Sequence, residues 1–159
     1  MASAQGDLPI DVLVAHPEPE GRAVIRHLLR CDSVRVVALT GDRAGTVTEA
    51  ARLLPAVVVL DDRLSGSDFA RALALRSKVV LLTAETDPQV IGRLLRSPAS
   101  GYLVYDYFDP EDLLPAVHAV AGGLAWLSPL VAAVAAEQMR ELTGPSTADA
   151  LSNAPDISR

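Results

Sequence analysis

A carboxylate ends an apolar run near the middle of the chain. Residues 57–60 read Val-Val-Val-Leu, and Asp61 and Asp62 follow immediately, before a polar loop. Four consecutive apolar residues, three of them β-branched, are typical of a strand covered on both faces in a parallel sheet. Ligands of such sheets bind beyond the carboxyl ends of the strands. Asp61 is therefore a candidate binding residue, and the alternative is a polar strand end that accepts hydrogen bonds from loop amides.

The elements that must position Asp61 alternate along the chain. Five apolar runs of strand length are separated by segments with helical periodicity. This order predicts an α/β fold with a doubly wound, five-stranded parallel sheet. The expected strands are 10–15, 34–40, 57–60, 78–83 and 102–105, and the expected helices are 19–30, 46–54, 68–75, 88–97 and 109–121.

Two of these helices have a predicted inward face. In the first helix we expect Ala23, Val24, His27 and Leu28 to pack on the sheet, because they lie on one face at helical spacing. In the second helix the same spacing selects Val47, Ala50, Ala51 and Leu54.

An additional helix is expected after the glycine pair at 122–123. Ser128 fits its N-cap and Pro129 its first position, and the helix continues to about Leu142. The flanking segments are polar. The predicted organisation is a disordered leader at 1–9, a domain at 10–124, a C-terminal extension helix within 125–142 and a flexible linker or tail at 143–159.

Composition limits the kind of protein. A chain of 159 residues with 50% hydrophobic content fits one well-buried domain. Its apolar runs are too short to cross a bilayer and its amino terminus lacks a signal peptide, so we expect a cytoplasmic protein with no membrane association. The single cysteine, Cys31, excludes an internal disulfide. The net charge of -6 argues against direct binding of nucleic acid by this chain. Thirteen Arg against one Lys, Lys78, indicate a bacterial genome of high GC content.

Residues 55–68 resemble a known family. They read Pro-Ala-Val-Val-Val-Leu-Asp-Asp-Arg-Leu-Ser-Gly-Ser-Asp, which is similar to the third strand and following loop of response-regulator receiver domains. The resemblance covers about residues 10–127 and implies the flavodoxin-like receiver fold. It implies that Asp61 occupies the phospho-acceptor position and that Thr83 and Tyr102 occupy the two switch positions. Residues 127–129, Leu-Ser-Pro, resemble the segment after the receiver in NarL/LuxR-type two-component regulators.

The sequence departs from the family's pattern at the two positions that would bind the metal and at the position of the family's lysine. His16 and Pro17 stand where the family has two adjacent carboxylates, and Tyr105 stands where it has its lysine. A histidine and a proline are poor replacements for the oxygen ligands that Mg²⁺ prefers. We therefore expect no cofactor and weak or absent Mg²⁺ binding, with Asp61 a vestigial acceptor. Four nearby residues could compensate in part and could line a pocket: Glu18, Asp62, Arg63 and Asp106.

The sequence thus predicts an atypical receiver domain, not an enzyme, that receives a signal for a bacterial transcriptional regulator. We expect it to be independent of conventional aspartyl phosphorylation and switched by homodimerisation or by a small-molecule ligand. DNA binding is implied only through a helix-turn-helix domain after the linker, outside this chain. One alternative is a receiver that is still phosphorylated at Asp61. Another is a small flavodoxin-like enzyme or cofactor-binding protein.

Overall fold

The apolar segments of the chain associate into one parallel sheet, as the computed structural model shows for residues 8–144. The sheet has six strands in the order β2-β1-β3-β4-β5-β6. The strands are β1 (Ile10–Ala15), β2 (Val34–Thr40), β3 (Val57–Asp61), β4 (Lys78–Thr83), β5 (Gly101–Val104) and β6 (Trp126–Leu127).

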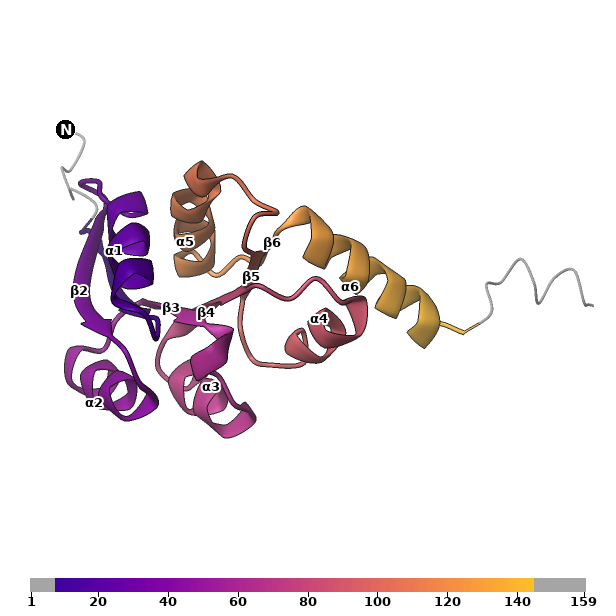
Figure 1. The fold of residues 1–159 in the computed structure, drawn as a ribbon, viewed down its shortest axis with the longest axis horizontal. Helices are drawn as coiled ribbons and strands as arrows, with labels where there is room; N and C mark the ends of the chain where they lie inside the picture. The colour runs from indigo at the N-terminus through magenta and orange to yellow at the C-terminus, as the bar shows by residue number, and fades with distance from the viewer. Residues whose placement is uncertain (1–7, 145–159) are drawn as a thin grey trace, which may run out of the picture.

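Helices cover both faces of the sheet (Figure 1). The helices α1 and α5 pack on one face, while α2, α3, α4 and part of α6 pack on the other. This is the doubly wound arrangement predicted from the alternation of elements. The helices are α1 (Pro19–Leu28), α2 (Arg43–Leu53), α3 (Ser67–Ala74), α4 (Pro88–Leu94), α5 (Leu113–Ala121) and α6 (Pro129–Leu142), with short 3-10 turns η1 (Asp62–Leu64) and η2 (Pro110–Asp112).

The prediction of five strands was wrong by one. Trp126 pairs with Gly101 and Leu127 with Tyr102, so β6 extends the sheet beyond β5. Two residues are too few to produce a recognisable alternation or apolar run, and this strand forms because β5 offers a free edge.

The inward faces of two helices differ from the prediction in part. In α1 the fully buried residue is Ile25, and Leu29 is buried just after the helix. Of the predicted face, Leu28 is half-buried against the core, whereas Val24 is 58% exposed. In α2, Ala50 is buried as predicted, together with Thr46, whereas Val47 is exposed. Apolar residues occupy adjacent stripes of these short helices, so periodicity does not choose between the stripes. Packing against the sheet decides which stripe is buried.

The strands β1, β3 and β4 form the centre of the core. All five residues of β3 are buried, and the four apolar side chains, Val57 to Leu60, alternate between the apolar clusters on the two faces of the sheet. Because the strands are parallel, their carboxyl ends meet at one edge. This edge brings the end of β3 close to the ends of β1 and β5.

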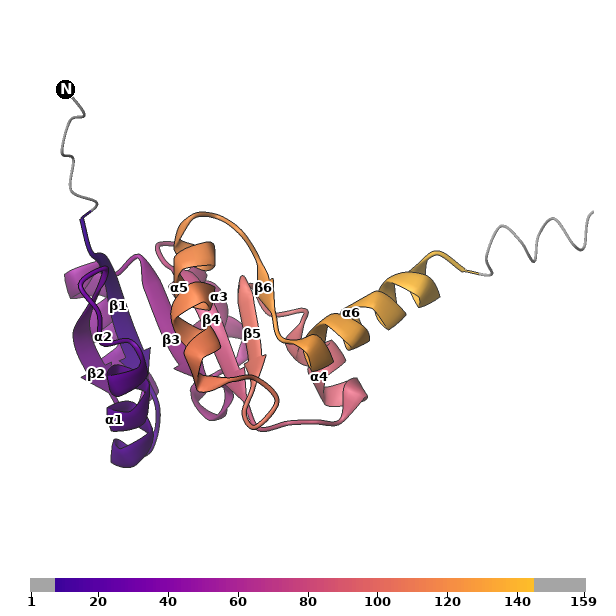
Figure 2. The same ribbon diagram turned by 90° about the horizontal axis from the view of Figure 1, so that it is seen from above.

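The C-terminal helix extends to one side of the sheet (Figure 2). It packs on α4 and β5, and it buries Val131 and Val134. The predicted boundary after residue 124 falls between α5 and β6. Most of the predicted leader and tail, residues 1–7 and 145–159, lies outside the described residues. No helix within 8–144 is long and apolar enough to span a membrane.

Candidate functional site

Asp61 is the last residue of β3, and its side chain is fully buried. Its Oδ1 atom accepts hydrogen bonds from the backbone N–H of Arg63, at 2.9 Å, and from Arg63 Nε, at 3.0 Å. Its Oδ2 atom accepts one from the Tyr105 hydroxyl, at 2.9 Å, and a longer one from Arg63 Nη2, at 3.3 Å. Both carboxylate oxygens are therefore engaged by donors of this chain.

Arg63 reaches Asp61 because the turn η1 follows β3 directly and reverses the chain over the strand end. Its guanidinium also donates to Glu18 Oε1, with Nη1 at 2.7 Å, and so bridges the ends of β3 and β1. Hydrogen bonds to Asp61 and then Glu18 raise the pKa of Arg63, and the bond to Arg63 lowers the pKa of Glu18. A fixed positive charge thus lies between two carboxylates.

His16 completes this cluster from the end of β1. Its Nδ1 atom accepts a hydrogen bond from the backbone N–H of Glu18, at 3.0 Å. In the neutral imidazole the other nitrogen, Nε2, then carries the proton, and it lies 3.3 Å from Asp61 Oδ2. The ring lies against Gly21, where any side chain would collide with it. Gly21 is a residue of the site that the sequence did not indicate, because its role depends on the folded position of His16.

The protonation of Asp61 reflects two opposing effects. Burial acts to raise the pKa of this carboxyl group, since a low dielectric disfavours the charged form. The hydrogen bonds from the Arg63 side chain, the Arg63 backbone and Tyr105 outweigh burial, so the pKa of Asp61 lies below its ordinary value. The pKa of Tyr105 is strongly raised, by burial first and then by the negative charge of Asp61. At neutral pH the site is an ionised carboxylate held by an arginine and a neutral phenol.

Thr83 and Tyr102, which the family resemblance predicts as switch positions, lie outside this cluster. Thr83 Oγ1 donates to Asp62 Oδ2 at 2.8 Å and accepts from the backbone of Glu85 at 3.0 Å. Burial raises the pKa of Asp62 despite this bond. The Tyr102 hydroxyl donates to the carbonyl of Ser97 at 2.6 Å, and its ring is buried.

Only some of the remaining predicted site residues join the Asp61 cluster. Glu18 and Arg63 reach Asp61 or its neighbours, whereas Asp62 turns to Thr83. Asp106 is exposed, with a left-handed φ of 66°. Within residues 8–144 its side chain makes no hydrogen bond or ion pair. Pro17 is half-buried and contributes no ligand atom.

The donor set does not fit the Mg²⁺ site that the family resemblance implies. Mg²⁺ requires oxygen ligands in near-octahedral geometry. Here the Asp61 oxygens already accept hydrogen bonds from Arg63 and Tyr105, and His16 presents a nitrogen. Among the residues that the structure describes, no group of three His, Cys, Asp or Glu side chains could hold a metal ion. The Arg63 guanidinium provides the positive charge at this edge of the sheet.

Comparison with known sequences identifies relatives along most of the chain. No protein-family model matches. NarL of Mycobacterium tuberculosis strain H37Rv, described as a transcriptional regulatory protein, is 31% identical over 143 residues, which cover 86% of this chain and 66% of the relative. NarL of Escherichia coli K12, a nitrate/nitrite response regulator, is 27% identical over 139 residues, which cover 83% and 64%. The chain therefore spans just under two thirds of the length of these relatives.

Solved structures that resemble this chain include a NarL receiver domain and RcsB. The signal receiver domain of NarL from M. tuberculosis is 28% identical, with a TM-score of 0.64, over 72% of this chain and 98% of that domain. RcsB, in a structure of two dimers bound to two parallel DNAs, is 19% identical with a TM-score of 0.71, over 79% of this chain and 67% of RcsB. The second likeness concerns the fold alone.

Proposed function

This chain belongs to the NarL/LuxR-type response regulators, and from this premise we propose that it is the signal-receiving domain of a bacterial transcriptional regulator that works without conventional phosphorylation of Asp61. The receiver would act in the cytoplasm and would reach DNA only through a separate domain. Membership of this family also weighs against the alternative of a flavodoxin-like enzyme.

One observation carries the proposal: the carboxylate of Asp61 is held by Arg63 and Tyr105. Phosphoryl transfer to an aspartate needs a free carboxylate oxygen and a cation that neutralises the incoming phosphoryl group. In this chain the nearest cation, Arg63, pairs with the carboxylate itself, and Tyr105 replaces the lysine charge with a neutral hydroxyl. A donor molecule would have to displace both contacts from a fully buried side chain.

We propose that the state of the domain is set instead by dimerisation or by a small molecule. The RcsB structure contains dimers, and homodimerisation is the corresponding proposal for this chain. Two surfaces are candidates for the dimer contact: the one formed by α4, β5 and α5, and the outer face of α6. Because β6 and α6 cover the edge of β5 and part of α4, we favour the outer face of α6, where Met139 is 68% exposed and Leu142 is 87% exposed.

The test is intact-mass measurement after incubation with Mg²⁺ and a small acyl phosphate. The expected result is no phosphoryl adduct on this chain. A triple variant, His16→Asp, Pro17→Asp and Tyr105→Lys, restores the family's ligands in the same fold and serves as the matched comparison. A NarL receiver in the same tube shows that the donor is active.

An adduct on the unmodified chain that is lost in Asp61→Asn would contradict the proposal. It would support the alternative of a phosphorylated receiver, with the Arg63 guanidinium neutralising the phosphoryl group in place of a metal.

A further inference from the structure

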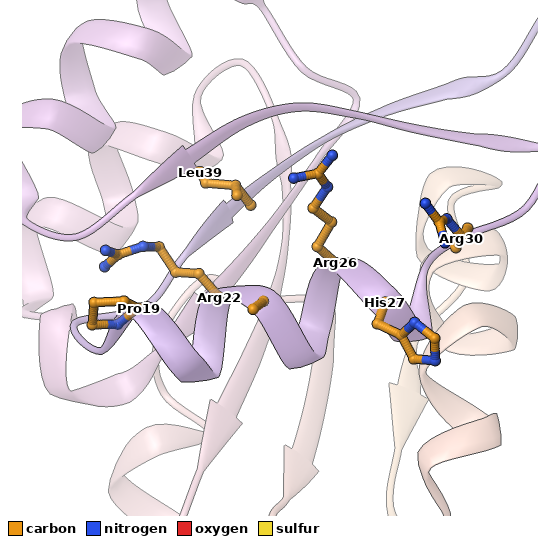
Figure 3. Close-up of a pocket in the computed structure, with 7 residues that line it drawn as sticks. Pro19, Arg22, Arg26, His27, Arg30 and Leu39 are labelled. Carbon is orange, nitrogen blue, oxygen red and sulfur yellow. The ribbon is translucent and has the colours of Figure 1, made fainter.

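A groove rich in arginine lies between α1 and the edge strand β2, away from Asp61. It has a volume of about 420 Å³ and is lined by Pro19, Arg22, Arg26, His27, Arg30 and Leu39. Figure 3 shows the Arg22 and Arg26 side chains on either side of Leu39, with Arg30 beyond the end of the helix. Leu39 is 39% exposed and gives the groove an apolar patch.

The arginines of this groove are not neutralised by neighbouring carboxylates. Within residues 8–144, no ion pair involves Arg22, Arg26 or Arg30. Arg22 and Arg26 are four residues apart on one helix, and like charges at this spacing destabilise a helix. The helix dipole favours Arg26 near the carboxyl end of α1, but it gives Arg22 no such advantage. A bound anion would remove this repulsion.

Arg22 is held in position in the groove. Its Nη1 atom donates to the carbonyl of His16 at 2.8 Å. A Cβ atom at Gly41 would lie 2.6 Å from the same nitrogen, so the glycine leaves the space that the guanidinium occupies. An ordered guanidinium loses less conformational entropy on binding than a free one.

We propose that this groove binds a small molecule that carries two or more phosphate groups. The planar guanidinium matches phosphate oxygens in pairs, and Arg22 and Arg26 are separated by about 6 Å along the helix axis, so two phosphates can each face one arginine. A compact ligand is favoured over nucleic acid because the chain as a whole has a charge of -6, which repels a long polyanion. The apolar patch at Leu39 can contact a non-phosphate part of the ligand.

The groove is also connected to the Asp61 cluster. Arg22 donates to the backbone of His16, whose ring lies 3.3 Å from Asp61. A phosphate bound by Arg22 in this position is one hydrogen bond away from the segment that carries His16. The ligand therefore has a short path to the residues at the end of β3.

The experiment is titration of the full chain with inorganic tripolyphosphate, without divalent cations, by calorimetry. Arg26→Gln is expected to weaken binding by about tenfold or more, as for loss of a charge-assisted contact. Arg26→Lys keeps the charge but not the planar fork and should lose part of the affinity. The control is Arg52→Gln, which removes the same charge from α2, where Arg52 pairs with Glu49. Circular dichroism checks that each variant is folded.

Several results would overturn the proposal. The first is that tripolyphosphate does not bind at concentrations up to about 1 mM, since a Kd of about 1 mM is the weak end of specific binding. Equal weakening by Arg26→Gln and Arg52→Gln would show attraction by overall charge. Equal or tighter binding of oligoglutamate or of duplex DNA would assign the groove to a protein partner or to nucleic acid. None of these results depends on whether Asp61 is phosphorylated.

Discussion

The side chain of Asp61 is stable as a buried carboxylate only because of its donors. Burial alone favours the protonated form, and three hydrogen bonds from Arg63 and one from Tyr105 reverse this preference. Glu18 in turn holds the far side of the Arg63 guanidinium. The cluster is therefore a structural unit in which removing one member leaves a buried charge without enough partners.

Arg63→Gln is expected to destabilise the protein in a pH-dependent manner. In the native chain the pKa of Asp61 is lowered, so its stabilising contribution is present above the pKa of an unfolded Asp and is lost as the pH falls through the folded value. In the variant, burial prevails and the folded pKa rises above the unfolded one, so the ionised carboxylate is destabilising at neutral pH. The loss should be largest near pH 7 and should shrink below about pH 4.

Urea unfolding at a series of pH values measures this difference. Arg52→Gln, which removes an exposed and paired arginine, should follow the native pH profile. A constant difference between Arg63→Gln and the native chain at all pH values would show that Arg63 contributes packing and not charge.

At the scale of the elements, helix starts differ in how they are capped. The helix α2 begins at Arg43, three residues before the predicted start, because the Asp42 side chain accepts a hydrogen bond from the backbone N–H of Gly45 at 2.6 Å. Ser128 precedes α6 with an extended backbone, as predicted for an N-cap, but its hydroxyl makes no capping bond. Within residues 8–144 this buried hydroxyl has no hydrogen-bond partner.

Two alanine substitutions should therefore have different effects on stability. Asp42→Ala should lower the free energy of unfolding by about 1 kcal/mol, as is typical for loss of an N-cap. Ser128→Ala should be neutral or slightly stabilising, since it removes an unsatisfied buried polar group. Thermal and urea unfolding of both variants measure the difference, and an equal loss in both would mean that Ser128 caps α6 in solution.

At the scale of the whole molecule, the C-terminal segment is part of the packed structure. The strand β6 completes the sheet, and Val131 and Val134 of α6 join the cluster that includes Ile91, Tyr102 and Val104. Removing this segment would expose one edge of the sheet and an apolar surface of α4.

A chain that ends at residue 124 should be less stable than the full chain by about 3–6 kcal/mol. This estimate counts only the two buried valine side chains of α6, at about 1.5–3 kcal/mol each. The midpoint of urea unfolding tests it. An unchanged midpoint would show that residues 10–124 fold independently and that α6 is an appended helix.

The sequence by itself determined the fold class and the position of Asp61. Buried parallel strands are apolar on both faces, so their runs stand out, and a carboxylate that ends such a run must lie at the edge of the sheet. Tertiary structure alone decided the sixth strand, which residues of α1 and α2 face the sheet most closely, and the hydrogen bonds by which the candidate residues Arg63 and Tyr105 hold Asp61. These depend on contacts between distant segments: Arg63 reaches Glu18 across 45 positions, and Tyr105 reaches Asp61 across 44. Local sequence patterns do not indicate the geometry of such contacts, because only the folded sheet brings the strand ends together.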